Sequence, residues 1–198
     1  MRKLSAVLAI GLAGAIAGPT QAAVVTYAAT LTGEAENPDV VTSGTGTVSV
    51  IVDDVLATMR VIAVFSGLIG KTTAAHIHCC NTNLLGHAGV ATTTPTFPGF
   101  QGGVTFGSYD STFDMNLPSS WNVAFVTANG GTTASAFGAL RTGLNAGGAY
   151  FNLHTTSFGG GEIRGQLQTV PEPGTLALVL GAIGLAAVGA GKRWGCLK

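Results

Sequence analysis

Two histidines and two cysteines within five residues form the part of the sequence best suited to chemistry, His76-Ile77-His78-Cys79-Cys80. In an extended strand, residues two positions apart point to the same face, so both imidazoles face one way and Ile77 faces the other. Imidazole nitrogens bind copper and zinc, and a metal site needs three or four such ligands. The spacing therefore predicts half of a metal site, which other segments must complete.

Two later segments could supply the missing ligands. In residues 149–154, Phe151 and Leu153 are expected in the core, which leaves His154 on the opposite, solvent-facing side of its strand. In residues 162–167 the same alternation turns Ile163 and Leu167 inward. The polar residues then expected together on the solvent-facing side are Tyr150, Asn152, Glu162, Arg164 and Gln166.

All four histidines of the chain meet if the strand of His76 lies beside these late strands, with His87 contributed by a loop. We therefore hypothesise a site for copper or zinc. Its ligands are His76, His78, His154 and His87, and its supporting face is Asn152, Glu162 and Arg164. The alternative is that the histidines serve only sheet hydrogen bonds and that Glu162 and Arg164 form a surface salt bridge, worth about 0–1 kcal/mol.

The adjacent Cys79 and Cys80 leave several alternatives open. They can close only an eight-membered ring, so a disulfide between them is expected to be unusually reducible. They can also remain thiols, bind a soft metal or pair between chains. The third cysteine, Cys196, lies near the end of the chain.

Both ends of the chain are expected to be targeting segments. Residues 1–22 have Arg2 and Lys3, an uncharged run and a small-residue cleavage site, which predicts a helical secretory signal peptide. Residues 174–191 are apolar and are followed by Lys192 and Arg193, which predicts a hydrophobic helix able to span a membrane with its positive end in the cytoplasm.

The body between these ends, residues 23–169, has the length of one domain. It carries four basic and eight acidic side chains, a net charge of −4, although the whole chain is neutral. A mildly acidic body with no Lys/Arg cluster argues against nucleic acid as a partner.

Short runs rich in β-branched and aromatic residues, separated by glycine and proline, predict an all-β fold. One alanine-rich segment, capped at Thr132 or Thr133 and running to Leu144, predicts a helix. The pattern favours an antiparallel β-sandwich or Greek-key barrel, immunoglobulin-like or superoxide-dismutase-like, with one short helix. The strands are expected at residues 24–32, 46–52, 57–65, 73–78, 108–117, 149–155 and 162–169.

Three ordered motifs carry a family resemblance. Ser66-Gly67-Leu68 leading into Ala74-Ala75-His76-Ile77-His78 is followed by residues 149–155 and then by 160–167, and residues 31–38 fit as an opening signature. Together they resemble the CHRD domain, first described in chordin. The resemblance implies an all-β extracellular domain, tied in chordin to modulation of a growth-factor ligand, with no activity established for bacterial members.

The C-terminal segment, residues 170–198, resembles the PEP-CTERM sorting signal through Pro171-Glu172-Pro173, the hydrophobic run and Lys192-Arg193-Trp194. That resemblance implies a Gram-negative host, export across the inner membrane and cleavage by an exosortase near Pro171-Glu172-Pro173. The span then anchors the protein in the membrane only transiently. Surface or extracellular placement implies exopolysaccharide or a surface protein as partner.

The order of the histidines is also similar to that of the copper ligands in copper/zinc superoxide dismutase. The chain lacks an evident second set of His and Asp for zinc, and similarity of fold does not transmit activity. We therefore expect a non-enzymatic binding or structural role at the cell surface or in the extracellular matrix. A copper-dependent redox enzyme is the alternative.

Overall fold

The computed structural model describes residues 24–81, 83 and 86–171. The predicted signal peptide and the predicted C-terminal hydrophobic helix lie outside these residues. Within the described ranges, no helix is long and apolar enough to cross a membrane.

Strands make up most of the described chain, as the β-branched runs predict. Their bounds are β1 Val24–Thr32, β2 Thr45–Asp53, β3 Thr58–Ser66, β4 Thr72–His78, β5 Gly107–Asp114, β6 Tyr150–Thr155, β7 Ile163–Gln166 and β8 Gln168–Thr169. All the pairings between these strands are antiparallel. The prediction of an all-β antiparallel fold is confirmed.

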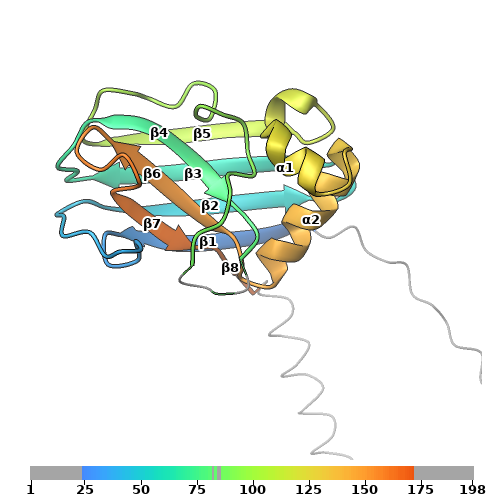
Figure 1. Ribbon diagram of the computed structural model, residues 1–198, viewed down its shortest axis with the longest axis horizontal. Coiled ribbons are helices and arrows are strands. Elements are labelled where there is room, and N and C mark those ends of the chain that lie inside the picture. Colours follow the sequence, from blue (N-terminus) through green and yellow to red (C-terminus); the bar gives the residue numbers. More distant parts are fainter. Residues whose placement is uncertain (1–23, 82, 84–85, 172–198) are drawn as a thin grey trace, which may run out of the picture.

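The strands form one curled sheet in the order β4-β6-β7-β1-β2-β3-β5, with β8 paired to β1. In Figure 1, β4, β6 and β7 lie in front of the layer formed by β1, β2, β3 and β5 and cross it at an angle. The sheet thus folds over on itself as a sandwich or partly open barrel. This order places β4 beside β6, although about 70 residues separate them along the chain.

The core lies between the two layers and is continuous. Alternating residues of β2 and β3, such as Val50 and Val61, face Ile77 of β4 and Phe151 of β6 in a single cluster of side chains. Phe97, from the long connection between β4 and β5, is fully buried and lies 5.2 Å from Phe113 and 6.2 Å from Phe151, measured between ring centroids. A segment without sequence periodicity therefore supplies a central aromatic residue of the core.

Two helices lie together at one end of the sandwich (Figure 1). The predicted helix is confirmed as α2, Thr133–Asn145, and Thr132 and Ser135 form a capping box at its start. The shorter helix, α1 Val123–Ala128, was not predicted because six residues are too few to show a helical period. A 3₁₀ turn, Pro118–Ser120, precedes α1.

Most of the predicted strand limits agree with the structure within one residue, and the two exceptions have local causes. The strand expected over residues 108–117 ends at Asp114, where the Asp114 carboxylate accepts the Asn116 backbone N–H and starts a turn. The strand expected over residues 162–169 is divided at Leu167, whose N–H is donated to Ala149 O.

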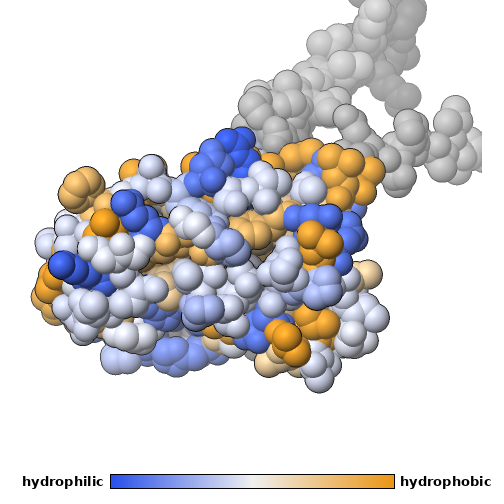
Figure 2. All heavy atoms as spheres, turned by 90° about the horizontal axis from the view of Figure 1, so that it is seen from above, coloured by the Kyte–Doolittle hydropathy of each residue, from blue (hydrophilic) through white to orange (hydrophobic). Residues whose placement is uncertain are grey.

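The surface seen in Figure 2 is dominated by neutral and weakly polar residues, with apolar residues in separate patches. Large apolar side chains that are exposed include Val41, Val123 and Phe106.

Candidate metal centre

Strand register brings three histidines to one face of the sheet. His76 and His78 alternate with Ile77 on β4, while Ala74 of β4 lies opposite His154 of β6 and His76 lies opposite Asn152. The imidazoles of His76 and His154 have ring centroids 5.2 Å apart, and each lies about as close to His78, at 5.9 and 6.0 Å. The predicted convergence of these three residues is therefore present in the structure.

The solvent exposure predicted for this face is wrong. Three cover segments, residues 33–40, 86–97 and 157–161, fold over it and contact its side chains through Glu36, Ala88, Pro95 and Gly159. The cover buries most of the face: the exposed fraction is 7% for His76, Tyr150, Asn152, Glu162 and Arg164 are buried as well, and His154 is half-buried. Alternation in a strand assigns a residue to a face, but it cannot reveal a loop that covers that face.

Each of the three imidazoles is held by a backbone carbonyl of a cover segment. His76 Nε2 lies 2.6 Å from Pro95 O, His78 Nδ1 lies 2.9 Å from Ala88 O, and His154 Nδ1 lies 3.0 Å from Gly159 O. A carbonyl oxygen only accepts, so each of these ring nitrogens carries the proton. The tautomers of these three histidines are thereby fixed.

The other nitrogen of each ring is unprotonated in the neutral form and has no protein partner. These atoms are His76 Nδ1, His78 Nε2 and His154 Nε2, all buried. The potential ligand atoms of the three residues lie within 4.8 Å of one another. Three nitrogens bonded to one ion at about 2 Å lie about 3.3–3.5 Å from one another, so side-chain rotations that close the cluster by about 1.5 Å would place an ion between the rings.

Burial keeps all three imidazoles neutral. It lowers the pKa of His76 and of His154, and it lowers the pKa of His78 to about 4, with further lowering from the neighbouring His154, His76 and Arg164. A neutral imidazole with a free lone pair is the form that binds a metal ion. The three ligand positions are therefore ready at neutral pH.

Tyr150 joins the histidines to a buried cation. Its ring stacks on His78 with centroids 4.8 Å apart and planes 6° apart, and the guanidinium carbon of Arg164 lies 4.7 Å from the Tyr150 centroid. The Ala88 N–H donates to the Tyr150 hydroxyl oxygen at 3.2 Å. Tyr150 thus stacks on His78 and is bonded to Ala88, the residue whose carbonyl oxygen accepts from His78 Nδ1.

Arg164 pairs with Glu36, which sequence reasoning did not assign to the site. The Arg164 Nε and a Glu36 carboxylate oxygen are 3.9 Å apart, and Arg164 Nε also donates to Ala35 O. Burial raises the pKa of Glu36 to about 7, against the opposing effect of Arg164. Glu36 lies in the opening segment of the chain, 116 positions before Asn152, and only its position in the CHRD-like signature could have marked it.

Glu162, predicted as part of the supporting face, serves the fold instead. It is fully buried, and it accepts hydrogen bonds from Thr42 Oγ1 (2.6 Å), Ile69 N (2.6 Å), Gly70 N (3.0 Å) and Thr155 Oγ1 (2.7 Å). Burial alone would raise the pKa of Glu162, but these four donors outweigh it and lower the pKa. The carboxylate fastens two loops to the end of the sheet.

His87 lies apart from the cluster of His76, His78 and His154. Its side chain is exposed, and its carbonyl oxygen accepts a hydrogen bond of 2.7 Å from Asn81 Nδ2. Asn152, the third predicted supporting residue, does lie beside His76 across the β4–β6 pair and donates through Nδ2 to Gly160 O at 3.3 Å. The predicted sorting motif lies at the edge of the described chain, with Pro171 inside it and Glu172 and Pro173 outside.

Cys79 and Cys80 form a disulfide directly after His78. Of the alternatives that the sequence left open, the structure contains the bonded pair. Cys79 is buried, while Cys80 is exposed. The pair is held in place by backbone bonds from Cys79 N to Gly89 O and from Asn81 N to Gly148 O.

The fold and this site define a class: an all-β sandwich domain with a buried, polar cluster of three histidines under a cover of loops. The CHRD domain model matches residues 27–167, from β1 into the end of the sheet. The chain belongs to the CHRD domain family. No curated protein and no solved structure shows significant similarity to it, and none of these comparisons points to superoxide dismutase.

Proposed function

We propose that this CHRD domain binds one copper or zinc ion through His76, His78 and His154. Two observations carry the proposal: each of the three imidazoles offers a ring nitrogen within 4.8 Å of the others, and each has one buried ring nitrogen without a protein partner. Each opposite nitrogen is fixed by a backbone carbonyl. A metal-binding histidine normally donates its second ring N–H to such an oxygen, which orients the ring and raises its basicity.

The alternative hypothesis, that the three histidines serve only hydrogen bonds, explains this arrangement less well. A buried polar atom without a partner costs about 1–3 kcal/mol, and the cluster holds three such nitrogens together. A single ion bonded to all three would remove that cost. Only one nitrogen of each ring is needed for the hydrogen bonds to the cover segments.

The donor set selects the kind of ion. Among the described residues, the cluster consists of three imidazoles and no carboxylate. Nitrogen donors suit copper and zinc, whereas magnesium and calcium take oxygen ligands. Three protein ligands leave a coordination position open for water or another small ligand.

We further propose that this binding takes place outside the cytoplasm, in an exported protein sorted by an exosortase and displayed at the surface or in the extracellular matrix of a Gram-negative bacterium. The signal-like residues 1–22 and the sorting-like residues 170–198 support this setting. The role is binding or structural rather than enzymatic. Exopolysaccharide or a surface protein is the proposed partner.

The test is metal analysis of the purified exported domain. The protein is incubated with Cu²⁺ or Zn²⁺, passed over a desalting column and analysed for bound metal. We expect about one ion per chain in the wild type and loss of that ion in His76→Ala, His78→Ala and His154→Ala.

His87→Ala is the matched control, because His87 is exposed and apart from the cluster. It should retain the ion. The proposal would be refuted if the wild-type domain held no stoichiometric copper or zinc, or if the His76→Ala variant bound as much of either metal as the wild type.

A further inference from the structure

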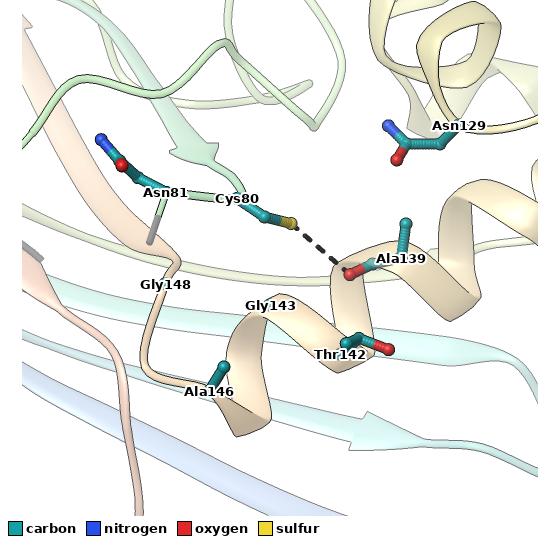
Figure 3. Close-up of a pocket in the computed structure, with 8 residues that line it drawn as sticks. All are labelled: Cys80, Asn81, Asn129, Ala139, Thr142, Gly143, Ala146 and Gly148. Carbon is teal, nitrogen blue, oxygen red and sulfur yellow. Dashed lines mark hydrogen bonds between the residues drawn. The ribbon is translucent and has the colours of Figure 1, made fainter. Parts of the chain in front are cut away.

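The disulfide between Cys79 and Cys80 forms a wall shared by two pockets. A pocket of about 510 Å³ lies between the disulfide and α2, and a second of about 370 Å³ lies between the disulfide and α1. The larger pocket is lined by Cys80, Asn81, Asn129, Ala139, Thr142, Gly143, Ala146 and Gly148. Figure 3 shows Cys80 reaching from the end of β4 toward α2, with Asn129 and Asn81 on either side of it.

The lining of the larger pocket is small and uncharged. Ala139, Gly143 and Ala146 form its α2 side, and its polar side chains are two amides and the Thr142 hydroxyl. Its volume falls within the range of small-molecule sites, about 300–1,000 Å³. The pocket therefore gives a small molecule a route to the Cys80 sulfur, and no carboxylate is among the described residues that line it.

Gly143 is the residue that lets the disulfide lie directly on the helix. A Cβ atom at this position would overlap the sulfur atoms of both Cys79 and Cys80. The two sulfurs thus rest on the α2 backbone. Only Cys80 is exposed, because Cys79 is packed in the core with 5% of its surface accessible.

We propose that Cys79–Cys80 is a site of thiol–disulfide exchange and that its substrate is a small-molecule thiol entering the pocket beside α2. The thiolate attacks Cys80 Sγ, a new S–S bond forms there, and the Cys79–Cys80 bond breaks with Cys79 leaving as a thiolate that takes up a proton. A second thiol then attacks the substrate sulfur of the mixed disulfide and releases Cys80. Two thiols are oxidised to one disulfide, and the protein disulfide is reduced to two thiols.

The pocket also has a partner ready for the reduced form. Cys80 Sγ lies 3.5 Å from the carbonyl oxygen of Ala139. A disulfide sulfur has no hydrogen to donate, so this contact becomes a hydrogen bond only when Cys80 is a thiol. Ala139 O would therefore stabilise the product of the reduction.

The experiment measures reduction of the disulfide in the folded full-length chain. The chain carries Cys196→Ser, so that all detected thiols come from Cys79 and Cys80. The protein is exposed to millimolar glutathione, and newly formed thiols are alkylated and counted by mass spectrometry. We expect two thiols to appear without unfolding. Filling the pocket with Ala139→Leu should slow their appearance by about tenfold, because the thiol must reach Cys80 through it.

Gly138→Ala is the control for that variant, since a Cβ at position 138 meets nothing within 4 Å and lies on α2 outside the pocket lining. It should be reduced at the wild-type rate. A disulfide that resists glutathione until urea unfolds the domain, or an Ala139→Leu variant reduced as fast as Gly138→Ala, would overturn the proposal.

Single-cysteine variants identify the attacked sulfur. In Cys79→Ser the remaining Cys80 should form a mixed disulfide with oxidised glutathione at least about tenfold faster than Cys79 does in Cys80→Ser, because access controls the rate. Equal rates in the two variants would contradict attack at Cys80.

Discussion

Replacing Glu162 by glutamine separates its structural role from the metal-binding role that the sequence suggested for it. The carboxylate is fully buried, and each of its oxygens accepts one backbone N–H and one hydroxyl. One oxygen takes Ile69 N and Thr42 Oγ1, and the other takes Gly70 N and Thr155 Oγ1. A glutamine amide can present only one oxygen to these four donors.

The hydroxyl groups can rotate to accept from the new NH₂ group, but a backbone N–H cannot. Whichever way the amide is turned, one of the two backbone donors, Ile69 N or Gly70 N, faces another donor. Losing a hydrogen bond to a charged group costs about 1.5–3 kcal/mol, and the remaining bonds weaken because they lose the charge. We expect Glu162→Gln to reduce the free energy of unfolding by roughly 3–5 kcal/mol.

Urea denaturation followed by far-UV circular dichroism measures this change. Thr42→Val is the comparison variant: it removes one hydroxyl bond to the same carboxylate, together with the bond that Thr42 Oγ1 accepts from Gly44 N, leaves both backbone donors to Glu162 satisfied, and should cost only about 1–2 kcal/mol. Under native conditions, folded Glu162→Gln should still bind metal as the wild type does. A loss of stability under about 1 kcal/mol, or loss of metal from the folded variant, would refute the assignment of Glu162 to the fold alone.

Three further predictions follow from the buried site. The pKa of Glu36 is raised from 4.5 to about 7 in the folded state, so folding takes up a proton between these pH values. As the pH rises from 4.5 to 7, the wild type should therefore lose roughly 3 kcal/mol of stability relative to Glu36→Gln. Urea denaturation of both proteins at several pH values measures this difference, and parallel pH profiles would contradict the prediction. Bound metal should persist below pH 6.5, where free imidazole becomes protonated, and should be lost as the pH approaches 4 and His78 is protonated. Desalting and elemental analysis at each pH measure the metal that remains. Release already at pH 6.5 would show that burial does not protect the ligands. Gly161→Ala should lower the thermal midpoint of unfolding and weaken metal binding, because Gly161 has φ +133° and the added Cβ would overlap Asn152 beside the site. Gly159→Ala is the control: the added Cβ lies in open space, so this variant should have little effect.

The strands and the three-histidine cluster were predictable because both follow from alternation. His76, Ile77 and His78 alternate on a short β-rich run, and Phe151 and Leu153 fix the face of His154 in the same way. The pairing of β4 with β6 was assumed in the sequence argument, and the observed register of Ala74 with His154 confirms it.

The cover over the site could not be predicted, since it is made by segments without periodicity. Glu36 approaches Arg164 from 128 positions away, and Pro95 reaches His76 from a loop whose threonines and prolines carry no pattern. For the same reason the sequence did not predict the burial of Phe97, which belongs to a loop and yet lies at the centre of the core. Contacts of this kind depend on the path of the backbone, which local sequence preferences do not determine.

The anchoring of the three imidazoles by main-chain carbonyls has a consequence for how this family can vary. A carbonyl is present whichever residue occupies position 88, 95 or 159, so the orientation of the rings depends on the course of the cover segments and not on their side chains. The cover can therefore change its side chains during evolution, or in the hands of a protein engineer, while the histidines stay in place. Two domains with the same buried cluster could then present quite different outer surfaces to their surroundings.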